Sequence, residues 1–321
     1  MKKVAFVLKY PLQSIQRSGN VVGDELYALS LSRELNATGL YAVDLLGNTS
    51  SVDPIYETLV YFNDNFPSID HAKTKKILYL QNGYPEGSIA KLLTLPLQKF
   101  HKIFVLSDLI KKKLEKYVDP KKVYTVPFGS IVSHEAKQGY FPGPEFKCDI
   151  SYLGNNIKGA RKTFEFFDAC NQFDFRVYGN WKRSKSQLAK ILLTHGLREF
   201  RLNQQAQQYA HGKLDQKYVT DLYQSSAINL NLTIDDCISN DIVTLRTLDI
   251  LNVGGFLISD SRSSQLPNGY VVSTNGVSLL NSIKEFLPRL DLREEIMLEG
   301  QATVRSSMLV SHTALKFAEF M

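Results

Sequence analysis

Two aspartates in the second half of the chain form the clearest chemical pattern. Asp241 and Asp249 are separated by seven residues, and Arg246 lies one helical turn before Asp249. Asp249 stands among apolar neighbours, so we expect its carboxylate to be half buried and to need hydrogen-bond donors. The diol of a ribose supplies two such donors. Arg246 could instead pair with Asp249 inside the protein or reach a phosphate, and both alternatives stay open.

The residues around this pair extend the pattern on both sides. Ser239 and Asn240 precede Asp241, which we expect at the N-terminus of a helix, where a negative charge is favourable. The stretch 229–233 comes before them and the stretch 254–260 follows, and both have the apolar character of strands. The pattern therefore predicts a strand, a polar loop, a helix that carries Asp249, and another strand.

A basic loop opens the same half of the chain. Gly154 and Asn155 follow an expected strand, and the cations Lys158, Arg161 and Lys162 stand at the beginning of the expected helix. Three cations at this end oppose the helix dipole unless an anion lies among them. A diphosphate is one such anion, and a solvated basic turn is the alternative.

Three further loops contain a glycine next to an expected strand or helix. They are Ser18, Gly19 and Asn20 after Arg17; Tyr178, Gly179 and Asn180 before Trp181; and Gly212, Lys213 and Leu214 after His211. Glycine lets a backbone approach a ligand closely, and the N–H groups at a helix start bind anions. The G-x-G-x-x-G dinucleotide fingerprint is absent. A plain loop at residues 17–20 and a core position for Trp181 are the competing interpretations.

Short apolar runs alternate with helix-length segments and would position these loops. The expected strands are 4–8, 41–46, 58–62, 77–80, 103–106, 123–126, 149–153, 173–178, 227–232 and 255–259. The expected helices are 22–35, 107–117 with Ser107 as its N-cap, 160–170, 215–225 and 292–321. Such alternation predicts parallel sheets covered by helices. The Gly- and Pro-rich stretch 138–147 predicts a linker, so we expect two α/β domains, 1–143 and 144–300, that face a central cleft at the carboxyl ends of their strands.

Composition excludes several classes of protein. The 321 residues are 44% hydrophobic and 22% charged, which is typical of soluble globular proteins and excludes disorder and collagen-like repeats. Three cysteines without paired spacing argue against a disulfide scaffold or a zinc site and fit a reducing cytoplasm. No apolar run approaches the roughly 18 residues of a membrane span. We therefore expect a cytoplasmic protein.

The net charge of +6 is concentrated in one region. Residues 99–122 contain eight lysines against three acidic residues, a local excess of +5. A solvated helix face is one interpretation. The other is a surface that approaches an anionic acceptor or the acidic inner face of a membrane. Nucleic acid ranks lower because recognisable binding motifs are absent.

Four segments resemble a known family: YLGN (152–155), VYGNW (177–181), GKLDQKYVTDLYQSSAINLNLT (212–233) and SNDIVTLRTLDILNVGGFLISD (239–260). They are similar to the GT-B fold glycosyltransferases of the retaining group-1 type, in particular the CgeB-like branch. The resemblance covers roughly residues 148–315. The first domain matches only in outline, through the Ser18–Asn20 loop, ILYLQN (77–82) and VYTVPFGS (123–130).

The resemblance implies a GT-B fold made of two Rossmann-like domains, with a C-terminal helix at 301–321 that crosses back to the N-terminal domain. It implies transfer of a sugar, with retention, from a nucleotide diphosphate sugar such as a UDP- or GDP-sugar to a glycan, lipid-linked or protein acceptor, as in polysaccharide biosynthesis. No other cofactor and no bound metal are expected. The alternatives are a non-catalytic scaffold that binds nucleotide or glycan, a DNA-modifying glucosyltransferase, and a phosphorylase or epimerase.

The resemblance also implies roles for individual residues. The family's two glutamates match Asp241, expected to contact the donor sugar, and Asp249, expected to bind the nucleotide ribose. Asn82, with Gln81 and Tyr84, is expected to contact the acceptor or the donor sugar. The remaining donor contacts are Ser18, Gly19, Asn20, Gly154, Asn155, Lys158, Arg161, Lys162, Tyr178, Gly179, Asn180, Gly212, Lys213, Leu214, Ser239, Asn240 and Arg246.

Overall fold

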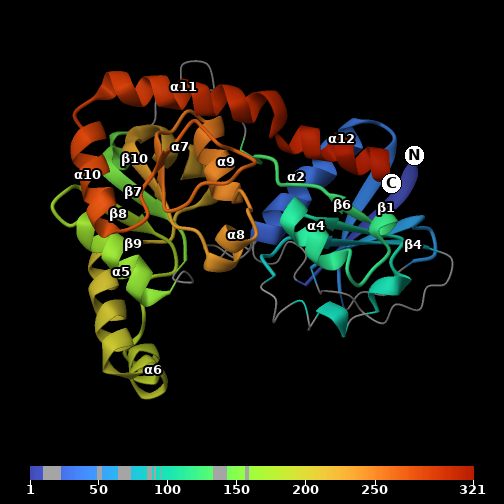
Figure 1. Cartoon of the computed structure of the whole chain (residues 1–321), viewed down its shortest axis with the longest axis horizontal. Coiled ribbons are helices and arrows are strands. Elements are labelled where there is room, and N and C mark those ends of the chain that lie inside the picture. Colours follow the sequence, from blue (N-terminus) through green and yellow to red (C-terminus); the bar gives the residue numbers. More distant parts are fainter. Residues whose placement is uncertain are drawn as a thin grey trace. The chain divides into compact units, whose positions relative to one another are not determined.

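The computed structural model describes residues 1–9, 23–48, 53–63, 74–84, 89, 92–94, 96–132, 143–155 and 159–321. The chain forms two compact units (Figure 1). Unit 1 comprises Met1–Ile131, Asp236–Leu245 and Ser307–Met321, and unit 2 comprises Val132–Asp235 and Arg246–Ser306. Each unit contains a six-stranded sheet whose strand pairs are all parallel. The predicted α/β class with two parallel sheets is confirmed.

The sheet of unit 1 has the strand order β2-β1-β3-β4-β5-β6. Its strands are β1 (Lys2–Leu8), β2 (Tyr41–Gly47), β3 (Thr58–Phe62), β4 (Lys75–Leu80), β5 (Lys102–Val105) and β6 (Val123–Thr125). All five residues of β3 are buried. Such uninterrupted apolar strands are typical of parallel sheets that helices cover on both faces.

Helices α2 (Gly23–Ala37), α4 (Asp108–Leu114) and α12 (Val310–Phe320) belong to unit 1. The Ser107 hydroxyl caps α4, because its oxygen accepts a hydrogen bond from the Ile110 N–H at 3.3 Å. The predicted N-cap is therefore confirmed.

Two late segments of the chain complete the core of unit 1. Phe317 on α12 packs against Tyr79 and Phe104, with ring centroids 5.1 and 4.8 Å away. Ile242, from the segment Asp236–Leu245, is also buried in this core. Unit 1 is thus built from three separate stretches of sequence.

The sheet of unit 2 has the order β12-β11-β10-β7-β8-β9. Its strands are β7 (Cys148–Leu153), β8 (Phe175–Tyr178), β9 (Ala210–Gly212), β10 (Ser226–Asn231), β11 (Leu257–Ser259) and β12 (Val271–Val272). Its helices are α5 (Ala160–Ala169), α6 (Lys185–Ala206), α7 (Val219–Ser225), α9 (Leu245–Asn252), α10 (Gly276–Phe286) and α11 (Leu290–Ser307), and the short α8 (Asp235–Ser239) lies where the chain passes from unit 2 to unit 1.

Helix α6 is the main element that the sequence prediction missed. It projects from the sheet of unit 2 (Figure 1) and exposes large apolar side chains such as Leu193 and Leu197. Ser184 and Gln187 form a capping box at its start, and Gly196 interrupts the helical backbone with a φ of 84°. Within the described residues, none of the helices combines the length and hydropathy of a membrane span.

Candidate functional site

Three of the glycine loops predicted from the sequence, those at Gly154, Gly179 and Gly212, meet at the carboxyl edge of the unit 2 sheet. Gly154 follows β7 and donates its N–H to the Tyr178 carbonyl at 2.9 Å. Gly179 follows β8 and donates to the Gly212 carbonyl at 2.8 Å. The side-chain oxygen of Asn155 accepts the N–H of Asn180 at 3.0 Å. Parallel sheets bind ligands at this edge, so the structure gathers these predicted donor contacts where a ligand is expected.

Close packing explains why glycine occupies two of these positions. A Cβ on Gly179 would lie 2.1 Å from the Gly154 carbonyl oxygen, and the φ of Gly179 is 137°. A Cβ on Gly154 would lie 2.7 Å from a guanidinium nitrogen of Arg246. The absence of side chains therefore lets the two turns and Arg246 pack together.

Trp181 supports this edge from inside the protein. Its side chain is buried, and its indole N–H donates to the Gly154 carbonyl at 2.5 Å. Its ring packs 5.1 Å from that of Phe167. The interpretation of Trp181 as a core residue is the one that the structure supports. Leu214 is also structural, because it packs against a small cluster around Tyr178 and Leu222.

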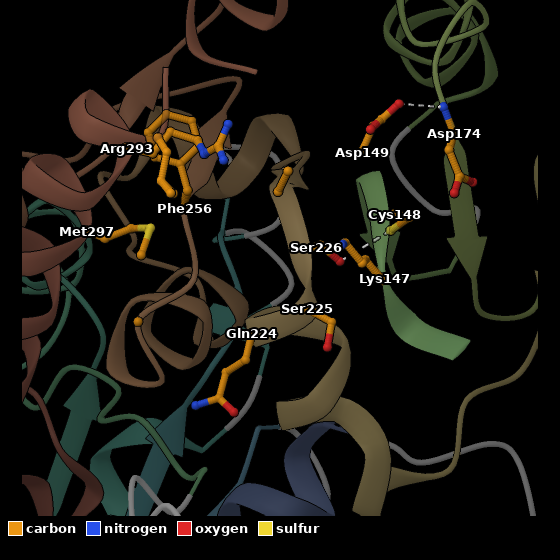
Figure 2. A pocket seen from close by; sticks show the side chains of 13 residues that line it. Lys147, Cys148, Asp149, Asp174, Gln224, Ser225, Ser226, Phe256, Arg293 and Met297 are labelled. Carbon is orange, nitrogen blue, oxygen red and sulfur yellow. Dashed lines mark hydrogen bonds between the residues drawn. The ribbon is translucent and has the colours of Figure 1, made fainter. Parts of the chain in front are cut away.

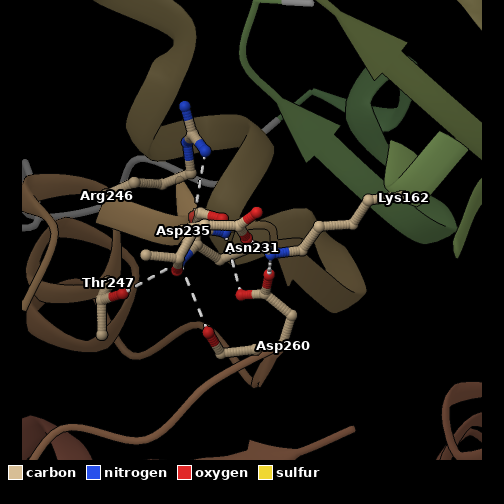
Figure 3. Close-up of polar contacts among 8 residues, drawn as sticks. Lys162, Asn231, Asp235, Arg246, Thr247 and Asp260 are labelled. Atoms are coloured by element: carbon tan, nitrogen blue, oxygen red, sulfur yellow. Dashed lines mark hydrogen bonds and ion pairs between the residues drawn. The ribbon is translucent and has the colours of Figure 1, made fainter. Parts of the chain in front are cut away.

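Lys162 forms the centre of a charged cluster at the same edge (Figure 3). Its ammonium lies 2.6 Å from the Asp260 carboxylate and 3.0 Å from that of Asp235, and it donates to the Thr233 carbonyl at 2.9 Å. The Thr233 N–H donates to the other Asp260 oxygen at 2.9 Å. Burial alone would lower the pKa of Lys162, but the hydrogen bonds and charges of Asp260 and Asp235 raise it above its usual value.

Arg246 occupies the other side of this network. Its guanidinium donates to the Asn231 side-chain oxygen at 2.9 Å and lies 5.4 Å from the centre of the Tyr152 ring. The Asn231 amide donates to the Thr247 hydroxyl at 3.2 Å (Figure 3). Asn231 is fully buried at the end of β10, so it fixes both the start of α9 and the direction of Arg246.

Asp249 lies on α9 and is buried, with an exposed fraction of 7%. The pKa of the neighbouring Tyr223 is raised, mainly by burial; the charge of Arg246 lowers it and that of Asp249 raises it. Both charged groups therefore lie near the Tyr223 hydroxyl. Asp249 is therefore more deeply buried than the half-buried carboxylate expected from the sequence.

Asp241 and Asp249 belong to different units, because the segment Asp236–Leu245 is part of unit 1. Asp241 does not begin the helix as expected, since α9 starts at Leu245. It lies instead in a turn with a φ of 55°, and its N–H donates to the Ile238 carbonyl at 3.1 Å. The polar residues Ser239–Asp241 are needed for this turn, and so the helix begins only after them.

Asn240 is fully buried next to Asp241 and is held from two sides. Its amide donates to the Asp236 carbonyl at 2.7 Å, and its oxygen accepts from the Lys113 ammonium at 2.7 Å. Ser239 is exposed, and its hydroxyl donates to the Asp236 carbonyl at 3.2 Å. Asn240 is thus an anchor for the turn that presents Asp241.

Asn82 is exposed in the loop after β4, and Asn63 holds this loop in place. The Asn63 oxygen accepts from the Gln81 N–H at 2.8 Å and from the Tyr84 hydroxyl at 3.3 Å. A Cβ on Gly83 would lie 2.5 Å from the Asp236 backbone. The Asn82 loop and the turn that carries Asp241 are therefore neighbours within unit 1.

The remaining predicted donor contacts are either exposed or outside the described residues. Arg161 and Lys213 are exposed on unit 2. Ser18, Gly19, Asn20 and Lys158 lie outside the described residues. Sequence reasoning assigned no role to Asn231, Asp235 or Asp260, although a polar residue that ends an apolar strand, as in INLN and FLISD, was a usable signal. Among the described residues, no group of three or more His, Cys, Asp or Glu side chains could hold a metal ion.

A pocket of about 470 Å³ lies at the opposite, amino edge of the unit 2 sheet (Figure 2). Several of its polar groups bond to one another. Asp149 accepts the Asp174 N–H at 3.0 Å, and the Cys148 sulfur lies 3.4 Å from the Ser226 hydroxyl. Burial raises the pKa of the Cys148 thiol, which disfavours the reactive thiolate. Volume alone therefore does not locate the functional site.

Comparisons with known proteins agree with the fold. The family model described as glycosyl transferase-like matches residues 161–319. No curated protein matches the sequence significantly. A glycosyltransferase from Rickettsia africae ESF-5 has 14% sequence identity and a TM-score of 0.66, with 99% of this chain and 97% of that chain covered.

Two further solved structures contain a nucleotide. Anabaena Alr3699/HepE, in complex with UDP and glucose, has 10% identity and a TM-score of 0.64, with 100% and 99% covered. T4 phage BGT, in complex with its UDP-glucose substrate, has 16% identity and a TM-score of 0.56, with 99% and 97% covered. These similarities span both sheets from end to end. The chain therefore has the two-sheet GT-B fold of these glycosyltransferases.

Proposed function

We propose that the protein is a glycosyltransferase that moves a sugar from a nucleotide diphosphate sugar to an acceptor hydroxyl. The observation that carries the proposal is the carboxyl edge of unit 2, where the Gly179 turn, Arg246 and the buried Asp249 lie within the region matched by the glycosyl transferase-like family model. A nucleotide needs these three features: backbone that permits close approach, a cation for phosphate and a carboxylate for the ribose.

The diphosphate is assigned to Arg246 and Arg161 together with the first N–H groups of α5. Among the residues that the structure describes, no side chain caps α5, whose N-cap is Gly159, and its first N–H groups are suited to an anion. Lys162 is a positioning residue in this proposal, because two carboxylates already surround its ammonium. Arg246 and the helix then stabilise the negative charge that develops on the leaving diphosphate.

The sugar and the acceptor are assigned to residues of unit 1. Asp241 contacts the donor sugar, and Asn82 contacts the sugar or the acceptor. Retention of the anomeric configuration is proposed from the resemblance to the retaining glycosyltransferases, whose two glutamates match Asp241 and Asp249. Proton NMR of the first product formed tests retention, and a product of the opposite anomeric form overturns it.

The donor is proposed to be a UDP-sugar, because T4 phage BGT and Anabaena Alr3699/HepE are both solved with UDP or a UDP-sugar. A thermal-shift screen against UDP-, GDP-, ADP-, TDP- and CMP-sugars tests this, since a ligand that binds the folded state raises its stability by mass action. Stabilisation by UDP-glucose above the other nucleotides is the expected result. Stabilisation by none of them overturns the proposed function.

A matched pair of variants tests the ribose contact. Asp249→Asn removes the charge that accepts the ribose hydroxyls, so affinity for the UDP-sugar should fall about tenfold or more. Asp168→Asn removes an exposed charge on α5 and should leave affinity unchanged.

A screen of glycan, lipid-linked, protein and duplex DNA acceptors separates the enzyme from a non-catalytic scaffold. If the protein binds the donor but neither hydrolyses it nor transfers its sugar to any of these acceptors, the scaffold is favoured.

The proposal includes catalysis without a bound metal, since cationic side chains and a helix start are available for the diphosphate. One structure of T4 phage BGT contains UDP and Mn²⁺. Transfer by this protein is therefore measured after treatment with EDTA and again with added Mn²⁺. Activity that survives EDTA supports the metal-independent reaction, and activity that returns only with Mn²⁺ refutes it.

A further inference from the structure

A small basic pocket lies on unit 1, at the end of α4 within the lysine-rich region 99–122. It has a volume of about 240 Å³ and is lined by Ile89, Lys113, Lys116 and Tyr117. Whole small-molecule ligands occupy pockets of roughly 300–1,000 Å³. The size therefore fits one group of a larger ligand.

The described lining residues suit a phosphate group. Lys113 and Lys116 supply ammonium groups, and Tyr117 supplies a phenolic hydroxyl. Two carboxylates at the ends of α4 are engaged elsewhere. Glu115, the C-cap of α4, lies 3.8 Å from the Lys111 ammonium, and Asp108 accepts from the Thr125 hydroxyl at 2.5 Å. Among the described residues, no carboxylate lines the pocket.

The pocket adjoins the part of unit 1 that the proposed function assigns to the sugar and the acceptor. The Lys113 ammonium that lines it donates to Asn240, which directly precedes Asp241. The Asn82 loop packs against the same segment through Gly83 and Asp236. One lysine thus connects the pocket to the turn that carries Asp241.

We propose that this pocket binds a phosphate group of the acceptor. The identification of the phosphate as part of the acceptor rests on the proposed function, whereas the binding of a phosphate in this pocket is independent of the proposed function. Lys116 and Tyr117 bind the phosphate directly, while Lys113 shares its ammonium between the phosphate and Asn240 and so positions the acceptor relative to Asp241.

Two charge reversals, one on α4 and one directly after it, test the pocket. Lys116→Glu places a carboxylate in it, and Lys112→Glu makes the same change at an exposed lysine of α4 that does not line it. Two probes are used. Binding of inorganic phosphate is measured by ³¹P NMR titration, and binding to vesicles of phosphatidylglycerol or phosphatidylcholine is measured by sedimentation. We expect Lys116→Glu to weaken phosphate binding about tenfold or more and Lys112→Glu to leave it nearly unchanged.

The outcomes separate the sources of the phosphate. If the protein binds both phosphate and phosphatidylglycerol vesicles, and Lys116→Glu loses both activities while Lys112→Glu keeps them, the pocket is assigned to a lipid headgroup. Binding of phosphate without vesicles assigns it to a soluble phosphorylated acceptor. Absence of phosphate binding, or equal losses in both variants, overturns the proposal. Duplex DNA that binds and is weakened equally by both variants points to a diffuse nucleic-acid surface and overturns it as well.

Hydrolysis of the UDP-sugar in the absence of acceptor distinguishes failure of the phosphate site from failure of the proposed function. Hydrolysis of the UDP-sugar without acceptor should be the same in Lys116→Glu and the parent protein. If the parent protein neither binds nor hydrolyses any nucleotide sugar but its phosphate binding depends on Lys116, the proposed function fails while the phosphate site stands.

Discussion

Replacing Lys162 by methionine should destabilise unit 2 strongly. The Lys162 ammonium lies 2.6 Å from Asp260, whose side chain is only 1% exposed. Methionine removes the compensating charge and leaves the Asp260 carboxylate with the Thr233 N–H as a remaining donor. A buried charge that loses its partner costs about 3–5 kcal/mol. With a urea dependence of about 2–3 kcal/mol/M, the midpoint of unfolding should fall by about 1–2 M.

The assay has a built-in reporter. Trp181 is the single tryptophan of the chain and is buried in the core of unit 2, so its fluorescence follows the unfolding of that unit. The double variant Lys162→Met with Asp260→Asn removes the orphaned charge and should recover most of the loss. Lys217→Met removes a lysine from an exposed pair with Asp215 and should leave the midpoint unchanged.

The reasoning is refuted by either of two results. One is a loss below about 1 kcal/mol in Lys162→Met, which would show that the Asp260 charge needs no ammonium partner. The other is a double variant that is no more stable than the single one. In that case the loss would come from the packing of the lysine stem and not from the buried charge.

Two further predictions concern Gly179 and Phe317, and a third concerns the pH dependence of the Lys162 contacts. Gly179→Ala should lower the urea midpoint and weaken UDP-sugar binding, and more so than Gly212→Ala, because both positions have a positive φ but only Gly179 packs against a carbonyl oxygen. Phe317→Ala should cost unit 1 about 3–5 kcal/mol in calorimetry, and the exposed Leu315→Ala on the same helix should cost little, so equal losses would contradict the packing argument. The pKa of Lys162 is raised in the folded protein. The contribution of Lys162 to stability should therefore be complete below its unfolded pKa of about 10.4 and should decline as the pH rises through the folded pKa. In urea titrations at alkaline pH, a Lys162→Met variant should lack this loss of stability.

Local patterns predicted most strands and the glycine turns. The predicted strand 58–62 agrees with β3 residue for residue, because a short apolar run in a parallel sheet is buried throughout. Helix α6 was missed because its apolar side chains do not form a buried face and Gly196 interrupts it. Periodicity predicts elements that bury one side, and α6 buries little.

The polar contacts of the site were beyond the sequence pattern. Lys162 appeared to be a free cation next to a helix start, but its partners Asp235 and Asp260 lie far along the chain on other loops. The turn at Asp241 was equally hidden, since the burial of Asn240 depends on Lys113 of α4. Spacing indicates which residues can do chemistry, whereas pairing between distant loops decides which charges remain available to a ligand.

The construction of unit 1 from three separate stretches has a consequence for inheritance and engineering. A crossover in the gene near residue 132 would exchange the six strands of the first sheet but leave Asp236–Leu245 and Ser307–Met321 behind. The exchanged sheet would then have to accept a foreign Ile242 and a foreign Phe317 in its core. Unit 1 therefore cannot be transplanted as one contiguous segment, and a chimera with an intact core needs all three stretches from the same parent.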